Sequence, residues 1–502
     1  MTRLVDPAGL GGAVVALLPE LFLAAWTLLV LGVVAWRHRT EEDSYLVGRL
    51  SLAGVVLAGL AYAALWLQGV RTTPDSAMVV LDDFRIAGAA IILLVAGPTI
   101  LLSLRFLDRQ RLLAPEYYVL VLLATLGMLA MVAAADLMVL FLGLELMSVA
   151  VYVLAGYDRF RRSSAEAALK YFLIGAFASG FLLYGIALVF GATGTTNLRL
   201  VAERLGPGPL SPMAGLGLGL LLVGFGFKVS AVPFHMWAPD VYDGAPTPVT
   251  GFMAAGVKAA GFAALARVLL EAFPAAAAAW QPVVGLLAVA TIVGGNVVAL
   301  AQHSLKRMLA YSSIAHAGYL LAALWAGSSV GLTALLLYLG AYCLTTVAAF
   351  GILLSIERVG SRTVLIEDLE GLFLVRPWAA LSMSVCLISL LGFPGTYGFI
   401  GKWSIIAAVA AEGQVLLAVA VVLGSAISAG YYLPVIMGMT MKPTRTPQSH
   451  RQVAFSRAAK VIVAGAVIAN LLFGVWPAPL VDAARDSAAA VIGAVGGGVA
   501  GR

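Results

Sequence analysis

Residues 215–235 read GLGLGLLLVGFGFKVSAVPFH, and this stretch decides the fold class. A long apolar run ends at Lys228, and Pro233 follows shortly after it. A helix needs about 20 apolar residues to cross a bilayer, so the run is typical of a membrane span. Proline lacks a backbone N–H and clashes with the preceding turn, which predicts a break in this span. Non-helical backbone at that depth is tolerated only inside protein or beside a wet cavity.

The composition of the whole chain is that of a membrane protein. Hydrophobic residues make up 62% of the 502 residues, and charged residues make up 11%. Soluble domains have about 45–50% apolar and about 25% charged residues. The mean hydropathy is +0.99. These values exclude a soluble enzyme, a disordered chain and a secreted disulfide scaffold.

Fourteen apolar runs are long enough to cross a membrane as helices. They centre near Trp26, Leu57, Leu94, Leu123, Leu146, Leu182, Leu221, Ala259, Val289, Leu320, Leu344, Ile388, Leu423 and Gly465. The runs do not alternate with polar residues, which excludes a closed β-barrel. The first run follows an N-terminus that is not basic, so we predict an anchor and not a removable signal peptide. The sequence therefore predicts an all-α, polytopic membrane protein.

The loop charges predict the orientation of these spans. Loops after odd-numbered spans carry 19 lysines and arginines, whereas the opposite side, termini included, carries eight. The positive-inside rule places the first set in the cytoplasm and both termini outside. The pI near 9.3 therefore follows from membrane orientation, and no basic stripe with interleaved aromatics indicates nucleic-acid binding.

Four of the seven lysines lie inside apolar runs, namely Lys170, Lys228, Lys258 and Lys402. All 24 arginines lie in loops or near the ends of spans. Charges at membrane depth are costly and mark ion or proton pathways. Lysine, unlike arginine, can release its proton when it is desolvated. We therefore predict a pathway of titratable lysines, with Lys170 as its weakest member because it could extend to the cytoplasmic interface.

Three further polar residues accompany the lysines. Glu145 lies midway along the fifth run, in MVLFLGLELMSVAVYVL. A single buried carboxyl is often only a hydrogen-bonding group, but together with four lysines it favours a proton or ion pathway. His235 follows Pro233 and His316 lies in the tenth run. We predict both histidines as secondary members, since a lone membrane histidine more often bonds a neighbouring helix.

A second break is predicted in residues 390–403, LLGFPGTYGFIGKW, where Pro394 lies among glycines and precedes Lys402. Two broken helices five spans apart are typical of an inverted-repeat transporter. Two ordinary proline kinks are the alternative, but they do not explain why a lysine lies beside each break.

No redox or metal centre is predicted in this chain. Cys343 and Cys386 have no second ligand at metal-binding spacing. The sequence also lacks a dinucleotide fingerprint, a phosphate-binding loop and paired haem histidines. The sequence therefore predicts no bound cofactor and no electron carrier.

Residues 228–262, KVSAVPFHMWAPDVYDGAPTPVTGFMAAGVKAAGF, closely resemble the signature of the antiporter-like membrane subunits of proton-pumping NADH:quinone oxidoreductase, respiratory complex I. Residues 304–321, SLKRMLAYSSIAHAGYLL, and residues 390–403 resemble it too. The resemblance extends from about the fourth span to the thirteenth. Among the three paralogous subunits of this family, the chain is most similar to the smallest, and its fourteen spans suggest a bacterial version.

The resemblance implies two inverted five-helix repeats, each with a broken helix. They comprise residues 113–275 for spans 4 to 8 and residues 276–441 for spans 9 to 13. Three N-terminal spans, residues 1–112, precede them, and a fourteenth helix with a tail, residues 442–502, follows.

The resemblance also implies the role of each buried residue. Glu145 is the acid of span 5 and Lys228 its partner on broken span 7. Lys170 is the lysine of span 6, Lys258 the central lysine of span 8, and Lys402 the lysine of broken span 12.

The implied function is proton translocation, driven by quinone reduction in neighbouring subunits. The flavin and the iron–sulfur clusters are then expected in partner subunits, and quinone is expected to bind elsewhere in the complex. The expected partners are the other complex I membrane subunits and the lipid bilayer, in the bacterial inner (cytoplasmic) membrane. One alternative is a subunit of a multi-subunit cation/proton antiporter, which shares much of this motif set. Another is a structural membrane anchor, against which the buried lysines argue.

Overall fold

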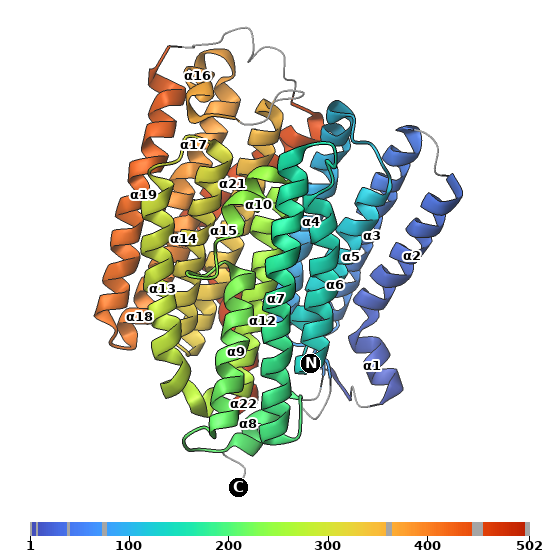
Figure 1. Cartoon of the computed structure of the whole chain (residues 1–502), viewed down its shortest axis with the longest axis vertical. Coiled ribbons are helices and arrows are strands. Elements are labelled where there is room, and N and C mark those ends of the chain that lie inside the picture. The colour runs from blue at the N-terminus through green and yellow to red at the C-terminus, as the bar shows by residue number, and fades with distance from the viewer. Residues whose placement is uncertain are drawn as a thin grey trace.

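The computed structural model describes residues 3–6, 9–37, 41–72, 78–357, 364–443 and 455–496. Most of its helices run along the long axis of the molecule (Figure 1). Within these residues, 13 helices are long and apolar enough to cross a membrane. Two shorter apolar helices, α17 (Pro377–Leu391) and α18 (Tyr397–Ala411), occupy the place of the remaining predicted span. Every predicted centre falls within a helix, so the all-α prediction is confirmed.

The described residues of the N-terminal part form three long helices and one pair of short strands. Its elements are β1 (Arg3–Val5), α1 (Leu10–Ala16), α2 (Leu18–Arg37), α3 (Glu41–Leu67), β2 (Val70–Thr72) and α4 (Asp83–Gln110). β1 and β2 pair in parallel, a small addition to the helical prediction. The first predicted run is divided into α1 and α2, and Pro19 occupies the first turn of α2, where a helix tolerates proline.

The first predicted repeat has the expected break. Its elements are α5 (Glu116–Ala133), α6 (Leu137–Ala155), α7 (Arg162–Thr193), α8 (Leu198–Leu205), α9 (Pro212–Val229), α10 (Ala238–Gly244), α11 (Thr247–Phe252), η1 (Met253–Val257), α12 (Lys258–Arg267) and η2 (Val268–Ala272). α9 ends one residue after Lys228, and Ser230 takes a left-handed conformation with φ 62°. Thr291 accepts a hydrogen bond from the freed N–H of Val232 at 2.9 Å. A side chain of a neighbouring helix therefore satisfies the backbone at the break.

The second predicted repeat contains the other break. Its elements are η3 (Pro274–Ala276), α13 (Ala277–Ala299), α14 (Leu305–Trp325), α15 (Ser329–Ile356), η4 (Ile366–Leu369), α16 (Leu372–Val375), α17, α18 and α19 (Val415–Met441). The chain leaves the helical conformation between Leu391 and Tyr397, around Pro394. Gly392 and Gly395 both have positive φ in this segment, 85° and 86°. Glycine adopts this conformation without the steric cost that a side chain would add.

Among the described residues after the second repeat are the helices α21 (Arg457–Val475) and α22 (Ala478–Gly496). The second of these corrects the prediction of a simple tail, because α22 buries Ala484, Ala488 and Val491. It packs against α4 and α15. Residues 444–454 and 497–502 of the predicted C-terminal part lie outside the described residues.

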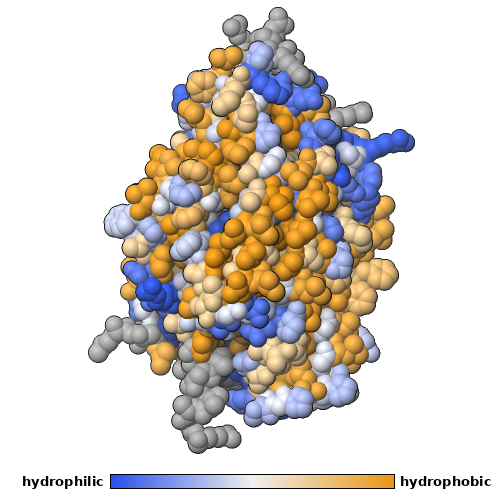
Figure 2. All heavy atoms as spheres, turned by 90° about the vertical axis from the view of Figure 1, so that its left-hand side faces the viewer, coloured by the Kyte–Doolittle hydropathy of each residue, from blue (hydrophilic) through white to orange (hydrophobic). Residues whose placement is uncertain are grey.

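The surface matches a membrane environment. Figure 2 shows hydrophobic residues gathered over the middle of one side of the molecule, with hydrophilic residues mostly toward its two ends. The span formed by α11, η1, α12 and η2 is wholly buried within the bundle. It contains two short π-helical segments, one on each side of α12, and such segments are frequent at functional sites.

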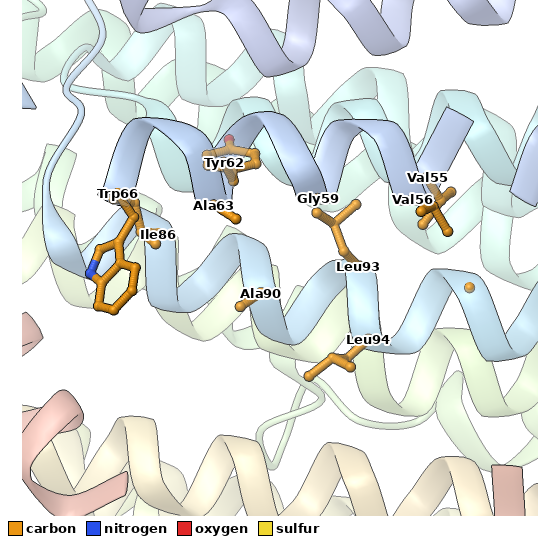
Figure 3. A pocket seen from close by; sticks show the side chains of 11 residues that line it. Val55, Val56, Gly59, Tyr62, Ala63, Trp66, Ile86, Ala90, Leu93 and Leu94 are labelled. Carbon is orange, nitrogen blue, oxygen red and sulfur yellow. The ribbon is translucent and has the colours of Figure 1, made fainter. Parts of the chain in front are cut away.

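An apolar groove of about 420 Å³ lies between α3 and α4 (Figure 3). Small residues such as Gly59, Ala63 and Ala90 form part of its lining, and Trp66 lies at one end. None of the predicted site residues lines it. The groove therefore belongs to the outer surface of the N-terminal helices and not to the lysine pathway.

Two arginines are fully buried where the N-terminal helices meet the first repeat. Arg85 on α4 is paired with Glu20 on α2 at 2.6 Å, and its backbone N–H donates to Asp82. Arg267 at the end of α12 is paired with the same Asp82 at 2.6 Å and with Glu271 at 2.5 Å. Removing one partner of a buried pair typically costs about 3–5 kcal/mol. This cluster therefore fastens the first three spans to the repeat.

Arg85 and Arg267 lie near the ends of spans, as the sequence indicates, but both are buried inside the bundle. Arg85 has 0% and Arg267 has 1% of its surface exposed. Both are surrounded by carboxylates and backbone carbonyls, so their charge is retained inside the protein. Burial alone therefore does not separate the lysines from the arginines. The two kinds of residue differ in their partners. The arginines are paired with carboxylates, whereas the described contacts of Lys228, Lys258 and Lys402 include no carboxylate at hydrogen-bond distance.

Candidate functional site

Lys228 lies in the last turn of α9, directly before the first break. Only 3% of its surface is exposed. Its Nζ donates to the hydroxyl of Ser148 on α6 at 2.7 Å. The same nitrogen lies 5.9 Å and 5.8 Å from the ring centroids of Tyr152 and Tyr171, within reach of a cation–π interaction. The carbonyl end of a helix carries partial negative charge, so this position favours a cation.

Glu145 lies one helical turn before Ser148 on α6. Its carboxylate accepts a short hydrogen bond from Ser179 on α7. In this structure Lys228 and Glu145 therefore have separate serine partners, and no ion pair within the described residues joins them. The predicted pair lies in one region of the protein, but its direct contact is not made in this conformation.

Lys258 begins α12, immediately after the first π-helical segment, and has 2% of its surface exposed. Its Nζ lies 2.5 Å from both the carbonyl and the hydroxyl oxygen of Ser313 on α14. Tyr342 on α15 donates to the same hydroxyl at 2.8 Å. Ser313 therefore connects the central lysine to a tyrosine of the neighbouring helix.

His316 continues this connection one turn further along α14. Its Nδ1 makes a short hydrogen bond with the hydroxyl of Tyr338, and its Nε2 lies 3.2 Å from the hydroxyl of Tyr432. Its ring also packs against Tyr342, with 5.2 Å between centroids. Ser313, one turn before it on α14, contacts Lys258, and Tyr319, one turn after it, lies against Lys402. The structure therefore places His316 between the two lysines.

Lys402 lies on α18 and points back across the second break. Its Nζ donates to the carbonyl of Leu391, the last residue of α17, at 2.9 Å. The same nitrogen lies 4.5 Å from the ring centroid of Tyr319 on α14. Tyr319 and Tyr338 pack edge to face, with 6.1 Å between centroids. Serine, histidine and tyrosine side chains therefore form a polar line from Lys258 to Lys402.

The link between Lys228 and Lys258 is a close approach of two helices. Gly261 lies one turn after Lys258 on α12. A Cβ at Gly261 would lie 3.5 Å from Cγ of Lys228 and 3.3 Å from a methyl group of Val229. A glycine therefore allows the helix of the central lysine to pack against the side chain of Lys228.

Lys170 differs from the other three lysines. Its side chain is 41% exposed and is paired with Glu166 at 2.6 Å and with Asp240 at 2.8 Å. Asp240 also accepts from Arg307 on α14 at 2.9 Å. This exposure agrees with its prediction as the weakest pathway member. Lys170 belongs to a partly exposed ionic cluster that links α7, α10 and α14, and its role in the pathway stays a prediction.

Lys306 was missed because it precedes Arg307 in what the sequence presents as a loop. Only 8% of its surface is exposed, and its Nζ donates to the carbonyls of Ala245 at 2.6 Å and Asp243 at 3.3 Å. These carbonyls lie at the C-terminal end of α10. Lys306 therefore fixes the second half of the first broken helix by binding the negative end of its dipole.

His235 lies in the first break and is only partly buried. Its Nδ1 has no hydrogen-bond partner within the described part of the chain. The structure therefore does not join it to the lysine line as it joins His316. Cys343 and Cys386 are buried free thiols, and the described residues contain no group of three or more side chains arranged to hold a metal ion.

These features define an antiporter-like membrane transport protein: a helical bundle with two broken helices and buried lysines beside the breaks. Residues 134–428 match the family described as NADH:quinone oxidoreductase/Mrp antiporter, TM. The match covers more than half of the chain, and the chain belongs to this family.

Relatives and solved structures agree with this assignment. NADH-quinone oxidoreductase subunit N of Gemmatimonas aurantiaca is 45% identical over 495 residues, which cover 96% of this chain and 94% of the relative. A chain of respiratory complex I from Thermus thermophilus with bound aureothin is 36% identical, with a TM-score of 0.79, and covers 93% of this chain and 99% of that one. A chain of the Mrp complex from Dietzia sp. DQ12-45-1b has a TM-score of 0.84 over 95% of this chain and 98% of that one. At 21% identity, the last likeness concerns the fold alone.

Proposed function

We propose that this chain is subunit N of a bacterial NADH:quinone oxidoreductase and translocates protons through its buried lysines. The observation that carries the proposal is the polar line from Lys258 to Lys402 through Ser313 and His316. The 45% identity to a relative named subunit N identifies the complex in which this line works. Quinone reduction in partner subunits supplies the energy, and the flavin and iron–sulfur clusters belong to those subunits. Residues 113–275 and 276–441 form the two inverted repeats.

The line can move protons because its members both donate and accept, with water bridging the ring contacts of Tyr342 and Tyr319, which are not hydrogen bonds. Lysine donates when charged and accepts when neutral, and the hydroxyls of tyrosine and serine do both. Neutral histidine likewise has one donor and one acceptor nitrogen, so His316 can take a proton from one tyrosine and give one to the other. Like charges disfavour each other's protonated state, so a proton arriving at Lys258 promotes release from Lys402.

Glu145 controls the first step of this mechanism. A carboxylate near an ammonium group stabilises its charge. With Glu145 bonded to Ser179, Lys228 lacks that contact and more readily passes its proton toward Lys258. A change of side-chain conformation that brings the carboxylate to Lys228 would restore the pair. The coupling signal from the partner subunits therefore acts on the choice of partner at Glu145.

Lys228 provides the test of the proposed function. Lys228→Met keeps the length and apolar volume of the side chain but removes the proton-carrying amine. We expect the complex to assemble and NADH-driven pumping in inverted membrane vesicles to fall by roughly tenfold or more. Lys460→Met, at an exposed position of α21, is the matched control. Equal pumping by the two variants would contradict the proposal, and cation-driven proton exchange without NADH would favour the antiporter alternative.

The orientation in the bacterial inner membrane is part of the proposal. The loop-charge asymmetry of 19 to 8 predicts that both termini face outward. We expect a reporter that is active only in the cytoplasm to be silent when fused after Arg502. The same reporter inserted in the loop after the third span is the positive control. Strong activity of the Arg502 fusion would overturn the orientation.

A further inference from the structure

One polar side chain of α21 connects the helices around the second break. Asn470 is 1% exposed and lies outside both predicted repeats. Its Oδ1 accepts from the hydroxyl of Ser389 on α17 at 2.5 Å, and its Nδ2 donates to Thr345 on α15 at 2.7 Å. Ser389 in turn accepts from the backbone N–H of Gly398 on α18 at 3.2 Å. One amide group thus joins both halves of the broken helix to α15.

The next turn of α21 contacts the break directly. Phe473 packs against Tyr397, the first residue of α18, with 5.7 Å between ring centroids. A Cβ added at Gly474 would lie 2.3 Å from the carbonyl oxygen of Gly395 and 2.5 Å from Cα of Thr396. Residues 470, 473 and 474 are spaced to lie on one face of a helix. One face of α21 therefore covers the break from Ser389 to Gly398.

We propose that this face of α21 is a positioning element for Lys402, with Asn470 and Gly474 as its essential residues. The inference rests on the proposed function of Lys402. The amine of Lys402 lies on one half of the broken helix and its acceptor, the carbonyl of Leu391, on the other. The distance between them is fixed only while the two halves keep their relative position. Asn470 bonds Ser389 in the first half directly, and through the hydroxyl of Ser389 it is connected to Gly398 in the second half. Gly474 lets α21 lie against the backbone between the two halves.

Gly474→Ala tests the proposal, with Gly465→Ala as its control on the same helix. A Cβ at Gly465 meets no heavy atom within 4 Å, whereas the Cβ at Gly474 meets backbone that cannot move aside. In the whole complex, we expect Gly474→Ala to speed hydrogen exchange in residues 389–400 and to lower proton pumping several-fold. Gly465→Ala should leave both unchanged. Normal pumping or unaltered exchange in Gly474→Ala would overturn the proposal.

Asn470→Leu keeps the test decisive if Gly474→Ala fails to assemble. Leucine has the same branched arrangement of side-chain heavy atoms but cannot bond Ser389 or Thr345, so we expect the same faster exchange and lower pumping. Failure of both variants to assemble, with Gly465→Ala intact, would overturn the proposal, because α21 would then be a general stability element. Lys402→Met separates the two ideas. If Lys402→Met abolishes pumping while Asn470→Leu pumps normally, the positioning role of α21 is wrong and the proposed function of Lys402 stands. If Lys402→Met pumps normally, the proposed function itself fails.

Discussion

Lys258→Arg is expected to leave the complex assembled and to abolish most NADH-driven proton pumping. Arginine keeps the positive charge but holds its proton, since its pKa is above about 12. A lysine that only supplies a fixed charge to the oxygens of Ser313 would tolerate this change in part. A relay lysine would not, and a positioned proton donor typically contributes 10²–10⁴-fold. Lys402→Arg should behave in the same way. The measurement is pumping per assembled complex in membrane vesicles.

Lys306→Arg is the matched control for this prediction. Lys306 is also buried and also donates to carbonyl oxygens, but those oxygens belong to the end of α10. A fixed charge is enough for that role, so we expect the arginine variant to retain most pumping. Lys258→Met has neither the bulk of the guanidinium nor a proton to carry. Normal pumping in Lys258→Met would therefore show that the size of the arginine side chain, and not its retained proton, causes the loss. Near-normal pumping in Lys258→Arg and Lys402→Arg would leave both lysines as structural charges.

Gly392→Ala is expected to lose most pumping, whereas Gly395→Ala loses much less. Both glycines have φ near +85° in the second break, so an added side chain costs each about 1–2 kcal/mol of backbone strain. The difference lies in the space around them. A Cβ at Gly392 would lie 2.6 Å from Cδ of Lys402, and a Cβ at Gly395 meets nothing within 4 Å.

The alanine at position 392 therefore displaces the lysine side chain from the carbonyl of Leu391. We would measure proton pumping and assembly of the two variants in parallel. The comparison separates the effect of displacing Lys402 from the effect of backbone strain, which both variants share. If both variants lost the same fraction of pumping, backbone strain alone would explain the effect. The contact of Lys402 with the break would then carry no function.

Much of the fold could be predicted because membrane spans are long and the breaks carry proline. Pro233 and Pro394 both lie where helices end and restart. α22 was missed because its alanines, which are good helix formers, follow the last apolar run and its charged residues Asp482 and Arg485 indicate no span.

The sequence reveals those site residues that are single charges within apolar runs. Lys228, Lys258 and Lys402 stand out for that reason, but Lys306 is hidden by the loop charges around it. Tyr338 and Tyr432 look like ordinary apolar bulk in a sequence, and only the structure shows their hydroxyls on His316. Asn470 offered a signal, because a polar residue in an apolar run is costly without a partner. Its partner on another helix could not be predicted from spacing.

The shared carboxylate of Asp82 has a consequence for the evolution of the chain. Asp82 lies just before the third span, and its partner Arg267 lies far along the sequence in the first repeat. A descendant that lost the first three spans would lose Asp82 and keep Arg267 with Glu271 as its remaining carboxylate. Glu271 could neutralise the guanidinium but could not fill the space of the departed helices. Loss of the first three spans should therefore be tolerated only together with a compensating change at or around Arg267.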